Sequence, residues 1–192
     1  GDVETTLTLD EFPSPETLWK MYHEQNHIAP SQDAIMDEPY YSDNPDKMPR
    51  YYQMNAINKT VEAISVGQNR VLLVMATGTG KTYTAFQIIW RLWKAGIKKR
   101  ILFLADRTAL ISQTFTNDFA PFKDKMTWVT KQHFDTAHEI YLALYQGLTG
   151  EDEDANALFS QFSPGFFDLI VVDTVYHISA DSSRRVCYFL FR

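Results

Sequence analysis

The sequence predicts an α/β fold in which a mostly parallel β-sheet is covered by helices on both faces. Two observations predict it. Short, continuous apolar runs alternate with segments whose apolar residues recur at helical spacing, a pattern typical of buried parallel strands joined by helices. A glycine-rich turn stands where one of these runs passes into a helical segment. Because ligands bind at the carboxyl ends of the strands in such sheets, polar residues at those ends are the candidates for a functional site.

The expected strands are short and apolar. We expect buried strands at Arg70–Met75 and Ile101–Leu104, a strand at Leu169–Val172 that ends at Asp173, and further strands at residues 126–129 and 139–144. Helices are expected where apolar residues recur every three or four positions. These sets are Met54, Ile57, Val61 and Ile64 before a C-cap at Gly67; Ala85, Ile88, Ile89 and Leu92 before Gly96; Leu110, Ile111, Phe115 and Phe119 before Pro121; and Ala157, Leu158 and Phe162 after the acidic run Glu151–Asp154.

The chain divides into three parts. Residues 1–49 are expected to be an N-terminal extension or linker, and residues 50–173 carry the regular alternation of strands and helices. Residues 174–192 form an atypical C-terminal tail. Its apolar end, Val186–Phe191, can pair as a strand or promote aggregation.

The N-terminal part contains one helix signal. Ser14 and Pro15 suit the N-cap and first position of a helix, so we expect a short helix through Leu18 to Tyr22. Met36–Pro49 is rich in Asp, Pro and Ser without strand or helix periodicity. We interpret this stretch as a surface linker.

Composition excludes several classes of protein. No apolar run approaches the length of about 20 residues that crosses a bilayer, and the single cysteine, Cys187, rules out an internal disulfide. We therefore expect a cytoplasmic protein with no membrane partner. The net charge of −6, from 18 basic and 24 acidic residues, argues against attraction of the whole surface to DNA. The five histidines have no convincing metal spacing.

The glycine-rich turn has the composition of a phosphate-binding loop. In such a loop, glycines let backbone N–H groups face phosphate oxygens, the lysine reaches the β- and γ-phosphates, and the threonine hydroxyl binds magnesium. Met75 stands where the strict motif has glycine, and an ordinary strand-to-helix turn is the alternative. The strand before the loop and the helix after it favour phosphate binding. The candidate ATP-binding residues in this loop are Thr77, Gly78, Thr79, Gly80, Lys81 and Thr82.

Asp173 ends an apolar strand some ninety residues after the loop. A carboxylate at this place holds the magnesium ion of a phosphate-loop enzyme, directly or through water. The candidate metal ligands are therefore Thr82 and Asp173. The alternative role for Asp173 is that of a turn or helix cap.

The motifs together resemble those of superfamily-2 helicases, and Phe103–Leu110 is particularly similar to the motor (R) subunit of type I restriction enzymes. The segments that carry the resemblance are Arg50–Gln53, Ala76–Thr82, Phe103–Leu110 with Gln113, Tyr145–Gln146 and Phe167–Asp173. The resemblance implies a three-layer RecA-like P-loop NTPase domain, incomplete at its C-terminus and truncated after the Asp173 strand. It also implies ATP and Mg²⁺ as cofactors. The implied partners are duplex DNA, through the parent enzyme, and the modification and specificity subunits of a restriction complex.

The resemblance also implies roles outside the loop. Gln53 would read the adenine edge, and Arg50 or Tyr52 would pack on the base. Arg107 would contact the DNA backbone, although a solvated surface arginine is a comparable alternative. For Tyr51 and Tyr52 the alternative is core packing at the start of a helix.

The chain departs from the family after the candidate catalytic residues Lys81 and Asp173. Thr174 stands where the family has the glutamate that activates water, and a hydroxyl is too weak a base to replace a carboxylate. His177 lies one place late, and the chain stops at Arg192 before a second lobe. We therefore expect an ATP-binding motor lobe that does not hydrolyse ATP by itself. A non-enzymatic nucleotide-binding or interaction fragment remains the main alternative, and a small-molecule P-loop kinase is less favoured.

Overall fold

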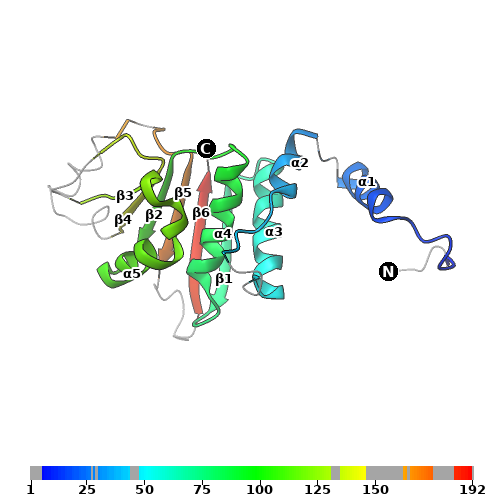
Figure 1. Ribbon diagram of the computed structural model, residues 1–192, viewed down its shortest axis with the longest axis horizontal. Helices are drawn as coiled ribbons and strands as arrows, with labels where there is room; N and C mark the ends of the chain where they lie inside the picture. The colour runs from blue at the N-terminus through cyan, green and yellow to red at the C-terminus, as the bar shows by residue number, and fades with distance from the viewer. Residues whose placement is uncertain are drawn as a thin grey trace.

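The computed structural model describes residues 6–26, 28, 30–43, 48–130, 135–145, 162–163, 165–174 and 184–191. Within these residues a single β-sheet has the strand order β1-β6-β5-β2-β4-β3. The strands are β1 (Arg70–Ala76), β2 (Ile101–Ala105), β3 (Met126–Trp128), β4 (Ile140–Leu144), β5 (Leu169–Thr174) and β6 (Arg184–Phe191). Figure 1 shows helices α4 and α5 in front of this sheet, and α1 standing away from it beyond α3.

The sheet is mostly parallel, as the sequence predicts. Strands β3, β4, β2 and β5 run parallel to one another, and Ala105 of β2 lies opposite Asp173 of β5. Strand β6 runs antiparallel to both of its neighbours, with Cys187 opposite Leu73 of β1 and Asp173 of β5. Of the two behaviours expected for the apolar tail, strand pairing is the one present.

Helices α3, α4 and α5 follow the predicted periodicity, whereas α2 was not predicted. The described helices are α1 (Pro15–Asn26), α2 (Pro30–Asp37), α3 (Tyr51–Ser65), α4 (Lys81–Lys94) and α5 (Thr108–Gln113), which continues as a π-turn η1 (Thr114–Asp118) and a 3₁₀ turn η2 (Ala120–Lys125). Gly67 and Gly96 end α3 and α4, because their N–H groups donate to carbonyl oxygens of the last helical turn at 3.0 Å. Helix α1 is longer than expected, and the Ser14 hydroxyl caps it by accepting the Thr17 N–H at 3.3 Å.

The core lies on the two faces of the central strands. On one face, apolar residues of α3, α4 and α5 pack against alternate residues of β2, β4 and β5, with Phe86 and Phe103 almost fully buried. On the other face, Tyr141 packs against Phe162 and Phe166 from connecting segments. Apart from Phe162, the helix expected after Glu151–Asp154 lies outside the described residues.

The prediction that β1 is buried is wrong. Val71 and Leu73 pack against the helical side of the core, whereas Leu72 and Val74 on the opposite face remain 51% and 53% exposed. The physical reason is its position: among the described strands, β1 is the first of the sheet and has a strand neighbour on one side only. Its continuous apolar run resembles that of a central strand, and sequence alone does not separate the two positions.

The segment interpreted as a surface linker contributes to the core. The Tyr41 N–H donates to Gln87 Oε1 at 2.9 Å, and Gln87 Nε2 donates to the Tyr41 carbonyl oxygen at 2.8 Å. The Tyr41 ring packs edge-on against Phe86 and Trp90 of α4. These contacts fasten Tyr41 to the helix that follows the phosphate loop. Among the described helices, none is long and apolar enough to cross a membrane.

Candidate nucleotide-binding site

The loop between β1 and α4 has a backbone that requires glycine at two positions. Gly78 and Gly80 have φ angles of 80° and 79°, a left-handed conformation that other residues rarely adopt. Gly80 is further constrained, because a Cβ atom there would lie 2.5 Å from Gln53 Nε2. A side chain at position 80 would therefore displace the end of the Gln53 side chain and strain the left-handed backbone.

Gln53 holds the loop from the first turn of α3. Its Nε2 donates to the Thr79 carbonyl oxygen at 2.8 Å, and its Oε1 accepts the Arg50 N–H at 2.8 Å. The side chain is 7% exposed, so both ends of the amide are bonded within the protein. The role of Gln53 in reading adenine stays a prediction. Holding the phosphate loop is a second role that the sequence did not reveal.

The residues beside Gln53 also gather around the loop. The Tyr52 hydroxyl donates to the Thr79 carbonyl oxygen at 3.4 Å, and Arg50 Nη1 donates to the same hydroxyl at 3.3 Å. Tyr51 is 78% exposed and packs edge-on against the Tyr52 ring. Core packing, the alternative considered for these two tyrosines, is therefore not the arrangement found.

Thr84 secures the other end of the loop. It is fully buried, and its hydroxyl donates to the Gly80 carbonyl oxygen at 2.9 Å. Sequence analysis missed this contact, although a threonine four residues after a loop carbonyl in the first helical turn is the signal for it. The loop is thus held by a side chain from α3 and by one from α4.

The candidate phosphate and metal residues meet at the carboxyl edge of the sheet. Lys81 is 8% exposed, and its Nζ lies 3.4 Å from the Ala76 carbonyl oxygen and 3.5 Å from that of Met75. Thr82 Oγ1 donates to Asp173 Oδ2 at 3.2 Å, although 91 positions separate the two residues. A hydroxyl and a carboxylate in contact supply the hard oxygen ligands that Mg²⁺ prefers, so the residues present fit that ion.

Arg107 lies apart from this group. It directly precedes α5, its side chain is 73% exposed, and its Nε lies 3.7 Å from Asp106 Oδ2. Asp106 is 8% exposed, and its Oδ1 has no hydrogen-bond partner among the described residues. The structure places Arg107 at the carboxyl end of β2, on the edge that also carries Asp173, without a described contact to the loop.

The fold and the site together define a helicase-like P-loop domain. The backbone resembles that of the UvsW helicase from bacteriophage T4, with a TM-score of 0.54 and 15% identity over 86% of this chain and 62% of that one. At that identity the likeness concerns the fold alone.

The sequence comparisons give the family. Residues 46–190 match the family described as type III restriction enzyme, res subunit, and the chain belongs to it. The chain is 58% identical over 185 residues to the type I restriction enzyme EcoAI endonuclease subunit of Escherichia coli, covering 95% of this chain and 23% of that relative. It is 40% identical over 108 residues to the type I restriction enzyme EcoKI endonuclease subunit of Escherichia coli strain K12. That match covers 55% of this chain and 8% of the relative. The expected superfamily-2 motor lobe of an R subunit is confirmed. The chain spans less than a quarter of either relative's length.

Proposed function

We propose that the chain is the ATP-binding motor lobe of a type I restriction enzyme whose whole subunit moves along duplex DNA and cuts it. The observation that carries this proposal is the contact of Thr82 with Asp173 at 3.2 Å, directly after a loop built on Gly78 and Gly80. This arrangement supports a site in which two oxygen ligands hold Mg²⁺ beside a phosphate cradle. The ion would neutralise phosphate charge when bound.

The chain's own residues would bind and orient the nucleotide. Lys81 would add its ammonium charge at the phosphate oxygens, and the amino end of α4 would add the positive end of the helix dipole. The hydrogen bonds from Gln53 to the Thr79 carbonyl oxygen and from the Arg50 N–H to Gln53, which we call the Gln53 clamp, would keep the loop in place as phosphate enters. Because Thr174 follows Asp173 where a carboxylate is expected, we propose binding without turnover at a motor rate.

Charge distribution supports DNA and acidic surfaces as partners of the lobe itself. Residues 1–49 hold 11 acidic residues against 2 basic ones, whereas residues 50–192 hold 13 acidic and 16 basic residues, a net charge of +3. The acidity of the whole chain therefore comes from its N-terminal part. We propose Arg107 as a contact to the DNA backbone, and modification and specificity subunits as the partners of the parent enzyme.

Calorimetry with ATP, with and without Mg²⁺, tests the proposal. Lys81→Ala should lower affinity about ten- to a hundredfold, because one charged phosphate contact contributes roughly 1.5–3 kcal/mol. Lys94→Ala is the matched control, since Lys94 ends the same helix and is exposed. Equal affinities of the wild type and Lys81→Ala would show that the loop does not bind phosphate. Magnesium-dependent binding with no phosphate release on duplex DNA is the result that this proposal predicts.

A further inference from the structure

A large groove separates helix α1 from α3 and from the segment that follows α2. Its volume is about 1180 Å³, above the upper end of about 1,000 Å³ for small-molecule pockets. Figure 1 shows α1 beyond α3, at the end of the molecule away from the sheet. We call this feature the α1–α3 groove. Its apolar walls are Leu18, Trp19, Tyr22, Met36, Pro39 and Tyr40.

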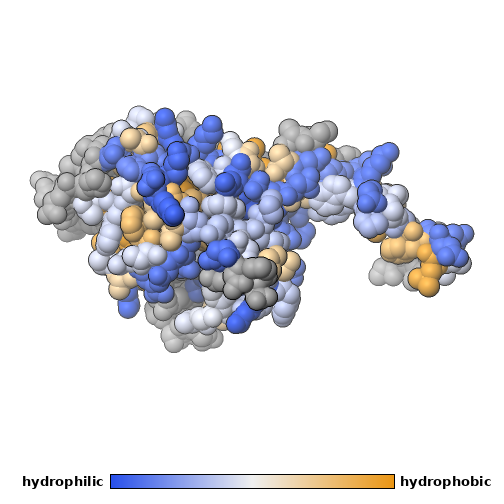
Figure 2. Space-filling view, in the orientation of Figure 1, coloured by the Kyte–Doolittle hydropathy of each residue, from blue (hydrophilic) through white to orange (hydrophobic). Residues whose placement is uncertain are grey.

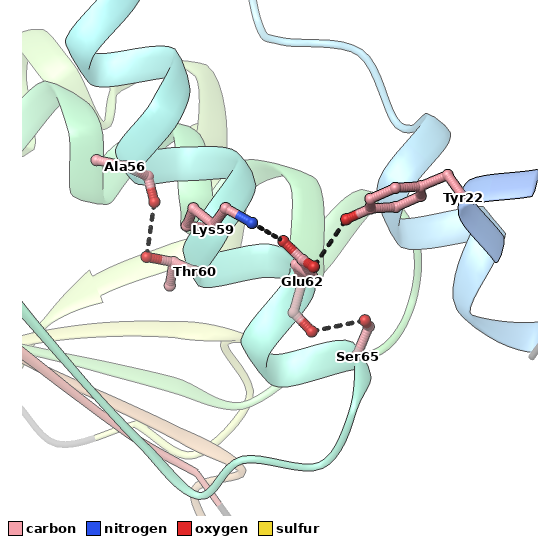
Figure 3. Close-up of polar contacts among 6 residues, drawn as sticks. All are labelled: Tyr22, Ala56, Lys59, Thr60, Glu62 and Ser65. Atoms are coloured by element: carbon pink, nitrogen blue, oxygen red, sulfur yellow. Dashed lines mark hydrogen bonds and ion pairs between the residues drawn. The ribbon is translucent and has the colours of Figure 1, made fainter. Parts of the chain in front are cut away.

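Polar contacts fix the distance between the two helices. The Tyr22 hydroxyl donates to Glu62 Oε1 at 2.7 Å, and Lys59 Nζ donates to Glu62 Oε2 at 2.8 Å. Figure 3 shows Tyr22 reaching from α1 to this pair on α3. Hydrogen bonds from Lys59 and Tyr22 lower the pKa of Glu62, so the carboxylate stays ionised at neutral pH. One side of the groove is therefore anchored by a bonded triad.

The floor of the groove is also bonded internally. Arg91 is 4% exposed, and its Nη2 donates to the carbonyl oxygens of Ile35 and Met36 at 3.0 and 2.5 Å. Asn58 Oδ1 accepts from Arg91 Nη1 and from the Tyr40 hydroxyl, both at 2.8 Å. The cation beneath the groove thus satisfies carbonyl oxygens of this chain.

Apolar surface and acidic charge remain for a partner. Leu18 and Trp19 are 40% and 41% exposed, and tryptophan is the residue type most often responsible for binding energy at interfaces. Asp37 and Glu38 also line the groove, whereas its basic lining residues, Lys59 and Arg91, are bonded to groups of this chain. Figure 2 also shows hydrophobic surface at the far end of the N-terminal arm.

We propose that the α1–α3 groove binds an amphipathic, basic helix of a partner protein. The apolar face of such a helix would cover Leu18, Trp19 and Tyr40, as helices do in hydrophobic grooves. Lysines or arginines along its border would face Asp37 and Glu38, which gives orientation and faster association. The same acidic border opposes nucleic acid. This surface lies outside the nucleotide site, and the proposal is independent of ATP binding.

Fluorescence anisotropy of a labelled peptide tests it on the full 192-residue chain. The probe is a helical peptide of about 18 residues, or five turns, with leucines at i, i+3, i+4 and i+7 and lysines beside them. A matched peptide carries glutamate at each lysine position. We expect the basic peptide to bind at least about tenfold more tightly than the acidic one, with a difference that shrinks as salt is added.

Substitutions inside and outside the groove test whether the peptide binds there or elsewhere on residues 1–49. Trp19→Ala should weaken binding of the basic peptide about tenfold. Asp37→Asn combined with Glu38→Gln should remove most of the preference for the basic peptide over the acidic one. Leu9→Ala, at a residue 96% exposed outside the groove, should change nothing. Circular dichroism and Tm check that each variant is folded.

Several results would overturn the proposal. Equal affinity for the two peptides, absence of binding, or an effect of Leu9→Ala as large as that of Trp19→Ala would each do so. Self-association of the chain that Trp19→Ala abolishes would identify a second copy as the occupant instead. Displacement of the peptide by duplex DNA in a Trp19-dependent manner would identify nucleic acid.

Discussion

Gln53 donates its side-chain amide to the carbonyl oxygen of Thr79 at 2.8 Å. The bond joins the first turn of α3 to the middle of the phosphate loop, and the Arg50 N–H orients the other end of the same amide. The residue proposed to recognise the base therefore also supports the residues proposed to bind phosphate.

A Gln53→Ala substitution should weaken the binding of both ATP and GTP. Loss of this contact removes one partly buried hydrogen bond to the loop, worth about 1 kcal/mol, or roughly fivefold in affinity. We also expect the wild type to prefer ATP over GTP and the variant to lose that preference, since an amide pairs with the adenine edge. Competition of the two nucleotides measures both effects. Unchanged GTP affinity in the variant would contradict the clamp, and a wild type without preference would contradict base reading.

A Gly80→Ala substitution should weaken nucleotide binding more than a matched glycine substitution elsewhere in the chain. The added Cβ meets Gln53 Nε2 at 2.5 Å in a left-handed backbone, so the end of the Gln53 side chain must shift and its hydrogen bond to Thr79 is disturbed. Gly67→Ala is the matched control, because Gly67 has a φ of 82° with no atom within 4 Å of an added Cβ. Both variants should lose about 1 kcal/mol or more of folding free energy, measured by urea denaturation. Equal ATP affinity in the two variants would argue against the close approach at Gly80.

The chain should not hydrolyse ATP at a motor rate, even with duplex DNA. Thr174 cannot act as the general base, and the absence of base assistance alone lowers the rate about 10²–10⁴-fold. Phosphate release by purified protein with linear duplex DNA is the measurement, beside Lys81→Ala to reveal contaminating ATPases. DNA-stimulated release that disappears in Lys81→Ala would refute this prediction.

Acid should destabilise the domain partly through Glu139. Hydrogen bonds from Trp93 Nε1 at 2.7 Å and from Lys125 Nζ at 3.1 Å lower the pKa of this carboxyl below its usual 4.5. A lowered folded-state pKa stabilises the fold above about pH 4.5, and this contribution is lost as pH falls through the folded value. Since the Glu139 side chain is one-third exposed, we expect its ionisation to contribute only about 0.5–1 kcal/mol to the free energy of unfolding.

The comparison for this effect is Glu139→Gln, which should be less stable than the wild type near neutral pH, with a difference that narrows as the pH falls below about 4.5. Glu24→Gln is the control, because Glu24 is 67% exposed and pairs with Lys20 only at 3.9 Å. Urea denaturation over this pH range measures the difference. A constant gap between the wild type and Glu139→Gln at all pH values would assign the effect to packing rather than to ionisation.

Much of the sheet could be predicted because its signals are local. The continuous apolar run Ile101–Leu104 predicts a strand buried on both faces, and the structure buries all four residues. Gly67 and Gly96 end their helices as expected. The meeting of Thr82 with Asp173 followed from placing both residues at the carboxyl ends of strands.

The errors concern neighbours distant in sequence. Val71–Val74 could not be assigned to an edge, since strand order depends on which segments pair. The bonds from Gln53 to Thr79 and from Tyr41 to Gln87 join residues 26 and 46 positions apart. Periodicity in the sequence does not predict such contacts, which form only when a loop or an irregular segment packs against a helix.

The position of β6 has a consequence for the order in which the protein assembles. Strands β1 and β5 carry the two halves of the nucleotide site, and in the described sheet β6 lies between them and pairs with both. It is also the last of these strands to leave the ribosome. Until then, the edges of β1 and β5 that pair with β6 have no strand partner in the described sheet. Pairings between segments this distant form slowly, and open edges attract other chains in the meantime. Synthesis of Arg184–Phe191 is thus the step that joins β1, and with it the phosphate loop, to β5 and Asp173 in the described sheet.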